Sequence, residues 1–217
     1  MIEIIVDGKQ IKALAGKSIL AAALDAGIYI PHLCHHPQFD FPADMVSVGT
    51  AYQGGLPRHG ENGADFQGCN LCLVEIQGEA GSVQSCKTRV EAGMAVTTHT
   101  EAIQKAREEN IARILETHPH VCLLCSQAAG CDRKICSLQI PEAERCCFKF
   151  GNCELQKVAD YIGIKKGLPP YIPPLKIQGV DHEPLFKRDY DLCIGCLRCA
   201  RICKEIKGAD AMCFTSD

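Results

Sequence analysis

His118-Pro-His-Val-Cys122-Leu-Leu-Cys125 opens the stretch that decides how this chain folds. Seven cysteines and His118 fall within the 36 residues from 118 to 153, at gaps as short as two residues. Cysteines that lie so close together either bind a metal or form disulfides. The chain of 217 residues holds 16 cysteines, so the question of metal binding or disulfide formation applies to its whole length.

Composition favours metal ligation over disulfides. The first eight residues mix charged and apolar side chains and are not a secretory signal, and no apolar stretch approaches the roughly 20 residues of a membrane span. We therefore expect a cytoplasmic protein, in which thiols stay reduced. The net charge of −3 and the absence of tryptophan give no indication of nucleic-acid binding.

The N-terminal part predicts a small α+β sheet with a helix packed across it. Two β-prone runs, 2–6 and 9–13, flank Asp7-Gly8, which is a strong hairpin signal. A helix over 19–26 is expected to follow them.

Four cysteines in this part have the spacing of [2Fe–2S] ligands. Plant-type ferredoxins combine a pair separated by two residues with two outlying single cysteines. The corresponding set is Cys34, Cys69, Cys72 and Cys86. Residues 37–67 are glycine-rich with little periodicity, so we expect a surface insertion there. A Rieske centre would need a second Cys/His pair, so His35 and His36 are expected to be loop residues.

A longer helix is predicted over 100–117. Its apolar residues cluster on one face, and the opposite, charged face is expected to be solvated. That charged face comprises Lys105, Arg107, Glu108 and Glu109. Pro119 prevents a clean continuation, so the helix should deliver His118 to the cysteine-rich stretch. Another helix is expected over 154–162.

The central stretch predicts at least one [4Fe–4S] cluster. Spacing assigns it to His118, Cys122, Cys125 and Cys131. Imidazole is neutral where thiolate is anionic, so such a cluster should have a higher potential than an all-thiolate one. Alternatively, His118 merely ends the preceding helix. Eight candidate ligands are enough for a second central cluster, on Cys136, Cys146, Cys147 and Cys153.

The C-terminal cysteines give the most specific signal. Gaps of two, two and three residues are typical of the bacterial [4Fe–4S] ferredoxin run. The set is Cys193, Cys196, Cys199 and Cys203. Lys204 stands where that run usually has proline, so Cys213 is an alternative fourth ligand. The proline-rich residues 168–174 predict an extended connector before this segment.

Taken together, the motifs resemble one architecture. They are Pro31-His-Leu-Cys34, Gly68-Cys-Asn-Leu-Cys72-Leu-Val-Glu, Ser85-Cys86, Glu91-Ala-Gly-Met94-Ala-Val, His118-Pro, Gly151-Asn-Cys153-Glu-Leu-Gln156 and Cys193-Ile-Gly-Cys196. It is the N-terminal iron–sulfur region shared by four proteins: the complex I large iron–sulfur subunit, the small diaphorase subunit of NAD-reducing hydrogenases, iron-only hydrogenases and NAD-dependent formate dehydrogenases. The resemblance covers nearly the whole chain.

This resemblance implies three parts. They are a β-grasp [2Fe–2S] domain over 1–98, a small helical domain over 99–167 with a histidine- and cysteine-ligated [4Fe–4S] cluster, and a linker with a ferredoxin-like [4Fe–4S] segment over 168–217. In the family, the cysteine of Gly-x-Cys-Glu-Leu-Gln closes the histidine-ligated cluster. The resemblance therefore nominates Cys153, where spacing nominates Cys131. The extra cysteines between them, and the single ferredoxin run, depart from the family pattern.

The resemblance also implies a function. We expect an electron-relay subunit with one [2Fe–2S] cluster and two or three [4Fe–4S] clusters, in a hetero-oligomeric complex with a flavin- and NAD(P)H-binding subunit and a catalytic redox subunit. The same layout also fronts some flavin-dependent, glutamate-synthase-like oxidoreductases. No Gly-x-Gly occurs in the sequence, so we expect this chain to bind neither flavin nor NAD, and to lack catalysis of its own.

Two other functions compete with the relay. A zinc-stabilised interaction module would use paired cysteine knuckles without any redox role. A self-contained redox enzyme would need an iron that lacks one protein ligand.

Overall fold

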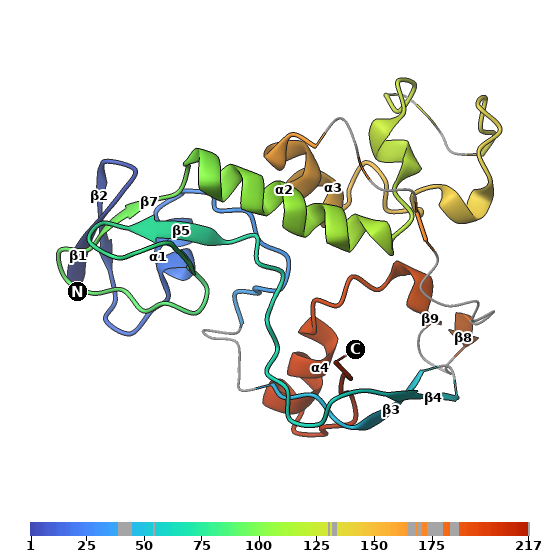
Figure 1. The fold of residues 1–217 in the computed structure, drawn as a ribbon, viewed down its shortest axis with the longest axis horizontal. Coiled ribbons are helices and arrows are strands. Elements are labelled where there is room, and N and C mark those ends of the chain that lie inside the picture. The colour runs from blue at the N-terminus through green and yellow to red at the C-terminus, as the bar shows by residue number, and fades with distance from the viewer. Residues whose placement is uncertain are drawn as a thin grey trace.

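A five-stranded sheet forms one end of the molecule (Figure 1). The computed structural model describes residues 1–38, 45–53, 55–129, 131, 134–164, 168, 171–172, 180–182 and 187–216. The sheet order is β2 (Lys9–Ala13), β1 (Ile2–Val6), β7 (Ala95–Thr97), β5 (Leu73–Ile76) and β6 (Ser82–Gln84). β1 pairs antiparallel with β2 and parallel with β7, and β5 pairs antiparallel with β6 and β7. The predicted α+β class is confirmed.

The predicted hairpin at Asp7-Gly8 is confirmed. Both residues have positive φ, 49° and 78°, as a tight turn between twisted strands requires. The Asp7 carboxylate accepts hydrogen bonds from the backbone N–H and the hydroxyl of Thr98, at 2.7 and 2.6 Å. The turn is thereby tied to the residue that follows β7.

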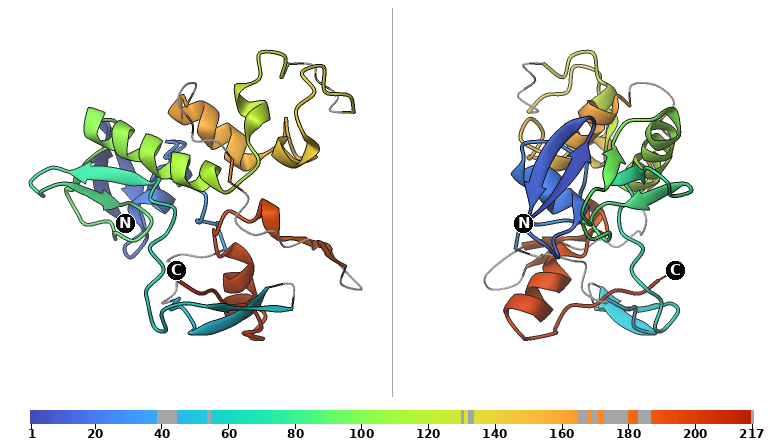
Figure 2. Two further views of the ribbon diagram at one scale, coloured as in Figure 1. Left: turned by 45° about the vertical axis from the view of Figure 1, so that its right-hand side comes forward. Right: turned by 90° about the vertical axis from the view of Figure 1, so that its left-hand side faces the viewer.

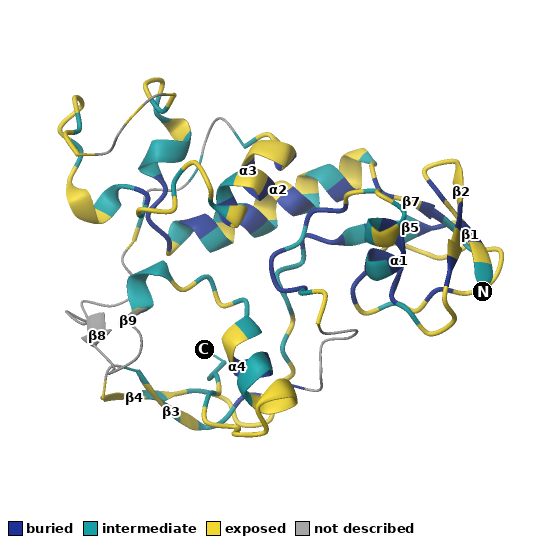
Figure 3. Cartoon of the chain, turned by 180° about the vertical axis from the view of Figure 1, so that it is seen from behind, coloured by how far each residue is buried: buried dark blue, intermediate teal, exposed yellow. Residues whose placement is uncertain are grey.

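Helix α1 (Ile19–Asp25) packs on the sheet, as predicted. Ser18 caps its N-terminus, with the hydroxyl oxygen accepting from the Ala21 N–H at 3.1 Å. Its buried residues join the strands' inward-facing side chains in one core, seen as dark blue in Figure 3. The position of this core therefore follows from two local features: the helix cap at Ser18 and the alternation of buried and exposed side chains along the strands.

Helices α2 (Glu101–Glu116) and α3 (Glu154–Ile162) pack against each other and form a second core (Figure 2). Both lie where the sequence predicts them. Thr100 caps α2 by accepting from the Ile103 N–H at 3.2 Å, and α3 ends at Gly163 in the left-handed conformation. Within the described residues, no helix combines the length and the hydropathy needed to cross a bilayer.

The prediction that the charged face of α2 is solvated is wrong at one position. Lys105, Glu108 and Glu109 are exposed, but Arg107 is only 1% exposed. Its guanidinium donates to the carbonyls of Leu71 and Leu73, which lie next to it because α2 packs beside β5. The side chain is buried because these acceptors replace water.

The expected insertion contains regular structure. β3 (Thr50–Gln53) pairs antiparallel with β4 (Leu56–His59), and a β-bridge joins Glu61 to Ser216. The Val48 N–H donates to the Phe214 carbonyl at 2.9 Å. Part of the block that we expected to be a surface insertion therefore packs against the C-terminal segment, as Figure 1 shows.

The remaining elements are short. They are the 3₁₀ turns η1 (Val121–Leu124), η2 (Glu142–Glu144) and η3 (Tyr190–Leu192), the strands β8 (Val180–His182) and β9 (Lys187–Asp189), helix α4 (Arg198–Arg201) and the π-helical turn η4 (Ile202–Ile206). Of the predicted connector 168–174, only residues 168, 171 and 172 lie within the described residues. The central and C-terminal cysteines thus lie mainly on loops and single turns.

Candidate metal centres

The four cysteines predicted for a [2Fe–2S] cluster converge in the structure. The Sγ atoms of Cys34 and Cys69 are 3.6 Å apart, and Cys72 is hydrogen-bonded to Cys86. Two thiolates on one tetrahedral metal ion, with bonds near 2.3 Å, would be roughly 3.8 Å apart. Every cysteine of the chain is a free thiol. Cys86 is also hydrogen-bonded to Cys34, so the four sulfurs form one connected group at distances that fit an iron–sulfur cluster.

The electrostatics favour the thiolate at two of these four cysteines and the thiol at the other two. The Cys69 hydrogen bond, followed by that of Cys86, lowers the pKa of Cys34, and the Cys86 hydrogen bond lowers the pKa of Cys72. The same shared protons raise the pKa of Cys69 and Cys86, with burial adding to the effect. Buried thiolates need a compensating positive charge. Iron would supply it, so the residues present fit the cluster.

Two residues in the left-handed conformation shape the loop on either side of Cys69. They are Gly68 (φ 82°) and Asn70 (φ 53°). A Cβ on Gly68 would lie 3.8 Å from the Cys34 sulfur. At the end of the loop, the Cys72 carbonyl accepts from the Ser85 N–H and hydroxyl at 3.0 and 2.6 Å. The absence of a side chain at Gly68 therefore lets the backbone of this loop lie close to the Cys34 sulfur.

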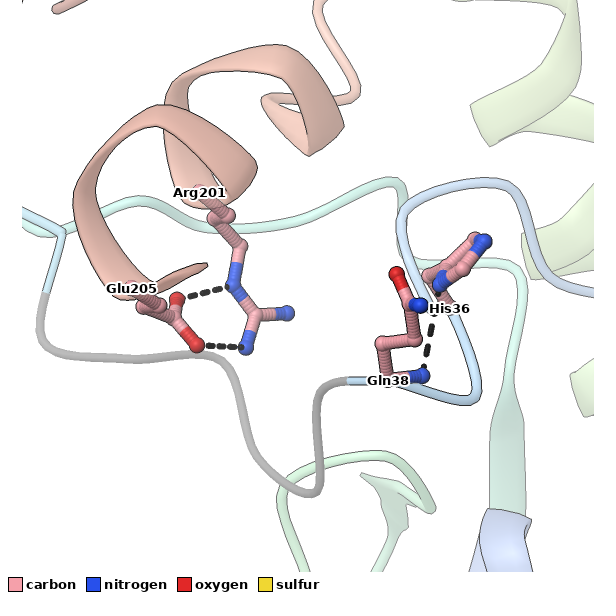
Figure 4. A network of polar contacts seen from close by, with 4 residues as sticks. All are labelled: His36, Gln38, Arg201 and Glu205. Carbon is pink, nitrogen blue, oxygen red and sulfur yellow. Dashed lines mark hydrogen bonds and ion pairs between the residues drawn. The ribbon is translucent and has the colours of Figure 1, made fainter. Parts of the chain in front are cut away.

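The two histidines after Cys34 lie in a loop, as expected. His35 is buried and its ring lies 5.4 Å from that of His32. Burial, with His32 second, lowers the pKa of His35 to about 4. The His36 Nδ1 accepts from the Gln38 N–H at 3.3 Å (Figure 4).

Figure 4 also shows what this loop faces on α4. Arg201 is only 3% exposed, and its Nε donates to Glu205 at 2.7 Å. The C-terminal segment thus brings the buried Arg201, paired with the more exposed Glu205, close to the loop that carries Cys34. No sequence signal indicated this neighbour, because Arg201 lies far beyond that cysteine in the chain.

His118 is placed as a ligand would be. It is buried, and its Nδ1 lies 3.0 Å from the Pro119 carbonyl, which fixes the proton on Nδ1. Burial lowers the pKa of His118, so the imidazole is neutral and its Nε2 lone pair is available to a metal. α2 delivers the residue, as predicted, through a hydrogen bond from the His118 N–H to the Leu115 carbonyl.

The eight central candidates divide between two neighbouring spaces. A cavity of about 530 Å³ is lined by Cys122, Cys125, Cys131 and Cys136. A narrow space of about 10 Å³ is bordered by His118, Cys146, Cys147 and Cys153. Burial, with the nearby Cys122 second, raises the pKa of Cys146 to about 12. His118 therefore borders the same space as Cys153, and Cys131 the same space as Cys136, while Cys122 and Cys146 are hydrogen-bonded across the two spaces.

The C-terminal cysteines lie around α4. Burial raises the pKa of Cys196, and the Cys203 sulfur accepts from the Ala211 N–H at 3.2 Å. Cys213 is exposed. Among the described residues, no three His, Cys, Asp or Glu side chains are arranged to hold a single metal ion.

Residues 1–48 and 53–101 match the family described as "2Fe-2S iron-sulfur cluster binding domain". These residues are therefore similar to [2Fe–2S] cluster-binding domains. All four converging cysteines fall inside the matched ranges.

The whole chain is also similar to several proteins with redox names. It is 28% identical over 209 residues to the mitochondrial NADH-ubiquinone oxidoreductase 78 kDa subunit of Candida albicans. It is 29% identical over 210 residues to an NADH-quinone oxidoreductase subunit of Rickettsia prowazekii, and 27% over 209 residues to YrhE of Bacillus subtilis, a formate dehydrogenase by name. These alignments cover 96%, 97% and 95% of this chain, but 23%, 24% and 16% of the relatives.

The fold is similar to that of a chain in the NAD+-reducing [NiFe]-hydrogenase in the H2-reduced state. The TM-score is 0.60 at 24% identity, and the match covers 97% of this chain and 68% of that one. The resemblance drawn from the sequence motifs is thus confirmed. The chain itself spans about a quarter or less of the length of these three relatives.

Proposed function

We propose that this chain is an iron–sulfur electron-transfer unit of a larger oxidoreductase. The observation that carries the proposal is the convergence of Cys34, Cys69, Cys72 and Cys86, which are linked by hydrogen bonds inside the residues matched as a [2Fe–2S] domain. A bound cluster would supply one-electron redox chemistry at this place. The protein would hold the irons, exclude water and set the potential.

The architecture supports a three-part relay. The sheet order β2-β1-β7-β5-β6, with α1 across it, supports a β-grasp assignment for residues 1–98. Residues 99–167 would form the central cluster domain, and 168–217 the linker and ferredoxin-like segment. α2 has 16 residues and is therefore about 24 Å long. The helix connects the proposed [2Fe–2S] site to His118. Its length would therefore set the distance between the [2Fe–2S] cluster and the histidine-ligated cluster.

For the central stretch we propose [4Fe–4S] binding, with three alternative groupings. Spacing groups His118, Cys122 and Cys125 with Cys131, whereas the family resemblance closes the set with Cys153. The grouping by cavity instead supports one all-cysteine set and one set containing His118 and Cys153. Cys146 and Cys147 are adjacent in the chain and can hardly both face one iron, so one of them would not be a cluster ligand. The C-terminal cluster would use Cys193, Cys196, Cys199 and Cys203.

One pair of variants separates the cavity grouping from the other two. Under the cavity grouping, Cys136→Ser and Cys122→Ser should abolish the same EPR signal, because both residues serve one cluster. Under the spacing grouping, they should abolish different signals. Cys213→Ser provides the control with no expected loss.

The proposed partners are a flavin- and NAD(P)H-binding subunit and a catalytic redox subunit. Support comes from relatives whose names describe NADH oxidoreductase subunits and from the similar fold in an NAD+-reducing hydrogenase. This chain would bind no flavin or dinucleotide itself, and it would work in the reducing cytoplasm. Co-purification from the native source would identify the partners.

Metal analysis of the full chain, purified anaerobically, tests the proposal. Iron, sulfide and an EPR signal that appears on reduction with dithionite are expected. More than about ten iron atoms per chain would support a second central cluster, and ten or fewer would count against it. Zinc without a reducible chromophore would overturn the relay and favour the zinc-stabilised module.

A further inference from the structure

Two side chains of α2 hold the ligand loop of the [2Fe–2S] site. The Asn110 Nδ2 donates to the Asn70 carbonyl at 3.0 Å. Arg107, one turn earlier on the same face, donates from Nε to the Leu71 carbonyl at 2.9 Å and from Nη2 to the Leu73 carbonyl at 2.8 Å. Together they bind three carbonyls within four residues around Cys72.

The carbonyl held by Asn110 fixes the orientation of a whole peptide unit. A peptide is planar, with its C=O and N–H on opposite sides. When the Asn70 carbonyl is directed at α2, the Leu71 N–H of the same unit is directed the other way. That N–H is hydrogen-bonded to the Cys69 sulfur, where it favours the thiolate. Asn110 therefore supports an N–H···S bond that it does not itself make.

Arg107 adds a buried positive charge. It is 1% exposed, and among the described residues no carboxylate forms an ion pair with it. Arginine keeps its charge even when buried. Its guanidinium interacts electrostatically with Cys72. A nearby cation favours the more negative, reduced form of a cluster, as do hydrogen bonds to its sulfurs.

We propose that Arg107 and Asn110 are positioning residues that raise the reduction potential of the [2Fe–2S] cluster through the Cys69–Cys72 loop. The effect has two parts, a peptide held so that its N–H meets the Cys69 sulfur, and a cation next to Cys72. The inference rests on the proposed [2Fe–2S] site. It adds that α2 raises the reduction potential of the [2Fe–2S] cluster. The same helix is followed by His118, a candidate ligand of the central cluster.

Reductive titration of the full chain, followed by EPR of the [2Fe–2S] signal, tests this inference. Asn110→Ala removes the hydrogen bond without changing charge, and Arg107→Lys keeps the charge but loses the two-carbonyl fork. Both should shift the midpoint potential to lower values. Arg113→Met is the matched control, because Arg113 is an exposed arginine of the same helix. It should leave the potential unchanged.

Two kinds of result support the inference: lower potentials at full iron content, or selective loss of the [2Fe–2S] signal while the [4Fe–4S] signals persist. Unchanged potentials in both variants overturn it, and so does equal loss of all clusters, which would show a merely structural role. A wild-type chain without any [2Fe–2S] signal would instead contradict the proposed function.

Discussion

Arg198 donates two hydrogen bonds, both 2.7 Å long, to the two carboxylate oxygens of Glu154. Glu154 follows Cys153 and begins α3, and Arg198 precedes Cys199 and begins α4. One ion pair therefore ties together two loops that carry candidate ligands of different clusters. A fork of this kind restricts orientation as well as distance.

A double-mutant cycle on Glu154→Gln and Arg198→Met should give a coupling of about 0.5 to 1 kcal/mol in the free energy of unfolding. The Glu154 side chain is 51% exposed, so solvent screening limits the value. The exposed pair Glu3–Lys12, 3.7 Å apart, is the control and should show no measurable coupling. Equal coupling energies in the two cycles would contradict the idea that the Glu154–Arg198 pair specifically joins the two cysteine-bearing loops.

The same pair predicts a pH dependence. Burial alone would raise the pKa of Glu154, but the Arg198 hydrogen bonds and charge outweigh it and lower the pKa overall. The stabilisation is thus present above the ordinary pKa of glutamate and is lost as pH falls through the lowered one. The coupling measured at about pH 8 and at about pH 6 should be the same. A decline within this range would show that Glu154 is not the titrating partner.

Gly60→Ala should detach the C-terminal segment from the insertion. A Cβ at this position would overlap the Ser216 carbonyl oxygen and lie 2.9 Å from the carbonyl carbon, so the backbone must shift, at a cost of about 1 to 3 kcal/mol. Gly49→Ala is the matched control, since its Cβ would meet Asn62 at an ordinary 3.5 Å. Limited proteolysis should cut the C-terminal segment faster only in Gly60→Ala.

Cys203→Ser should remove the C-terminal [4Fe–4S] signal, whereas Cys213→Ser should retain it. The Cys203 sulfur already accepts a backbone N–H, as cluster thiolates commonly do, and it lies one turn beyond Cys199. EPR and iron content of the two variants decide between them. The reverse result would make Cys213 the fourth ligand.

Asp7→Asn should lower the free energy of unfolding by about 1 kcal/mol. Asparagine tolerates the left-handed turn conformation, so the change isolates the loss of the charged acceptor for Thr98. Asp25→Asn, an exposed carboxylate paired with Lys17, is the control with a smaller effect. Thermal unfolding of the two variants compares them directly.

Local signals in the sequence predicted the elements near the first site closely. The hairpin, the caps at Ser18 and Thr100, and the ends of α2 and α3 follow from residues within a few positions of each other. Arg107 could not be predicted in this way. Its neighbours along the helix are charged and exposed, and its acceptors lie 34 and 36 residues away in the chain.

By itself, the sequence determined the turn at Asp7 and the helix boundaries, because each depends on contacts within one turn or one strand pair. Only the tertiary structure decided that the insertion packs on the C-terminal segment near Ser216, that Arg107 is buried, and that His118 and Cys153 border one small space. These depend on packing between distant segments, where burial and carbonyl acceptors outweigh the preference of a residue for water.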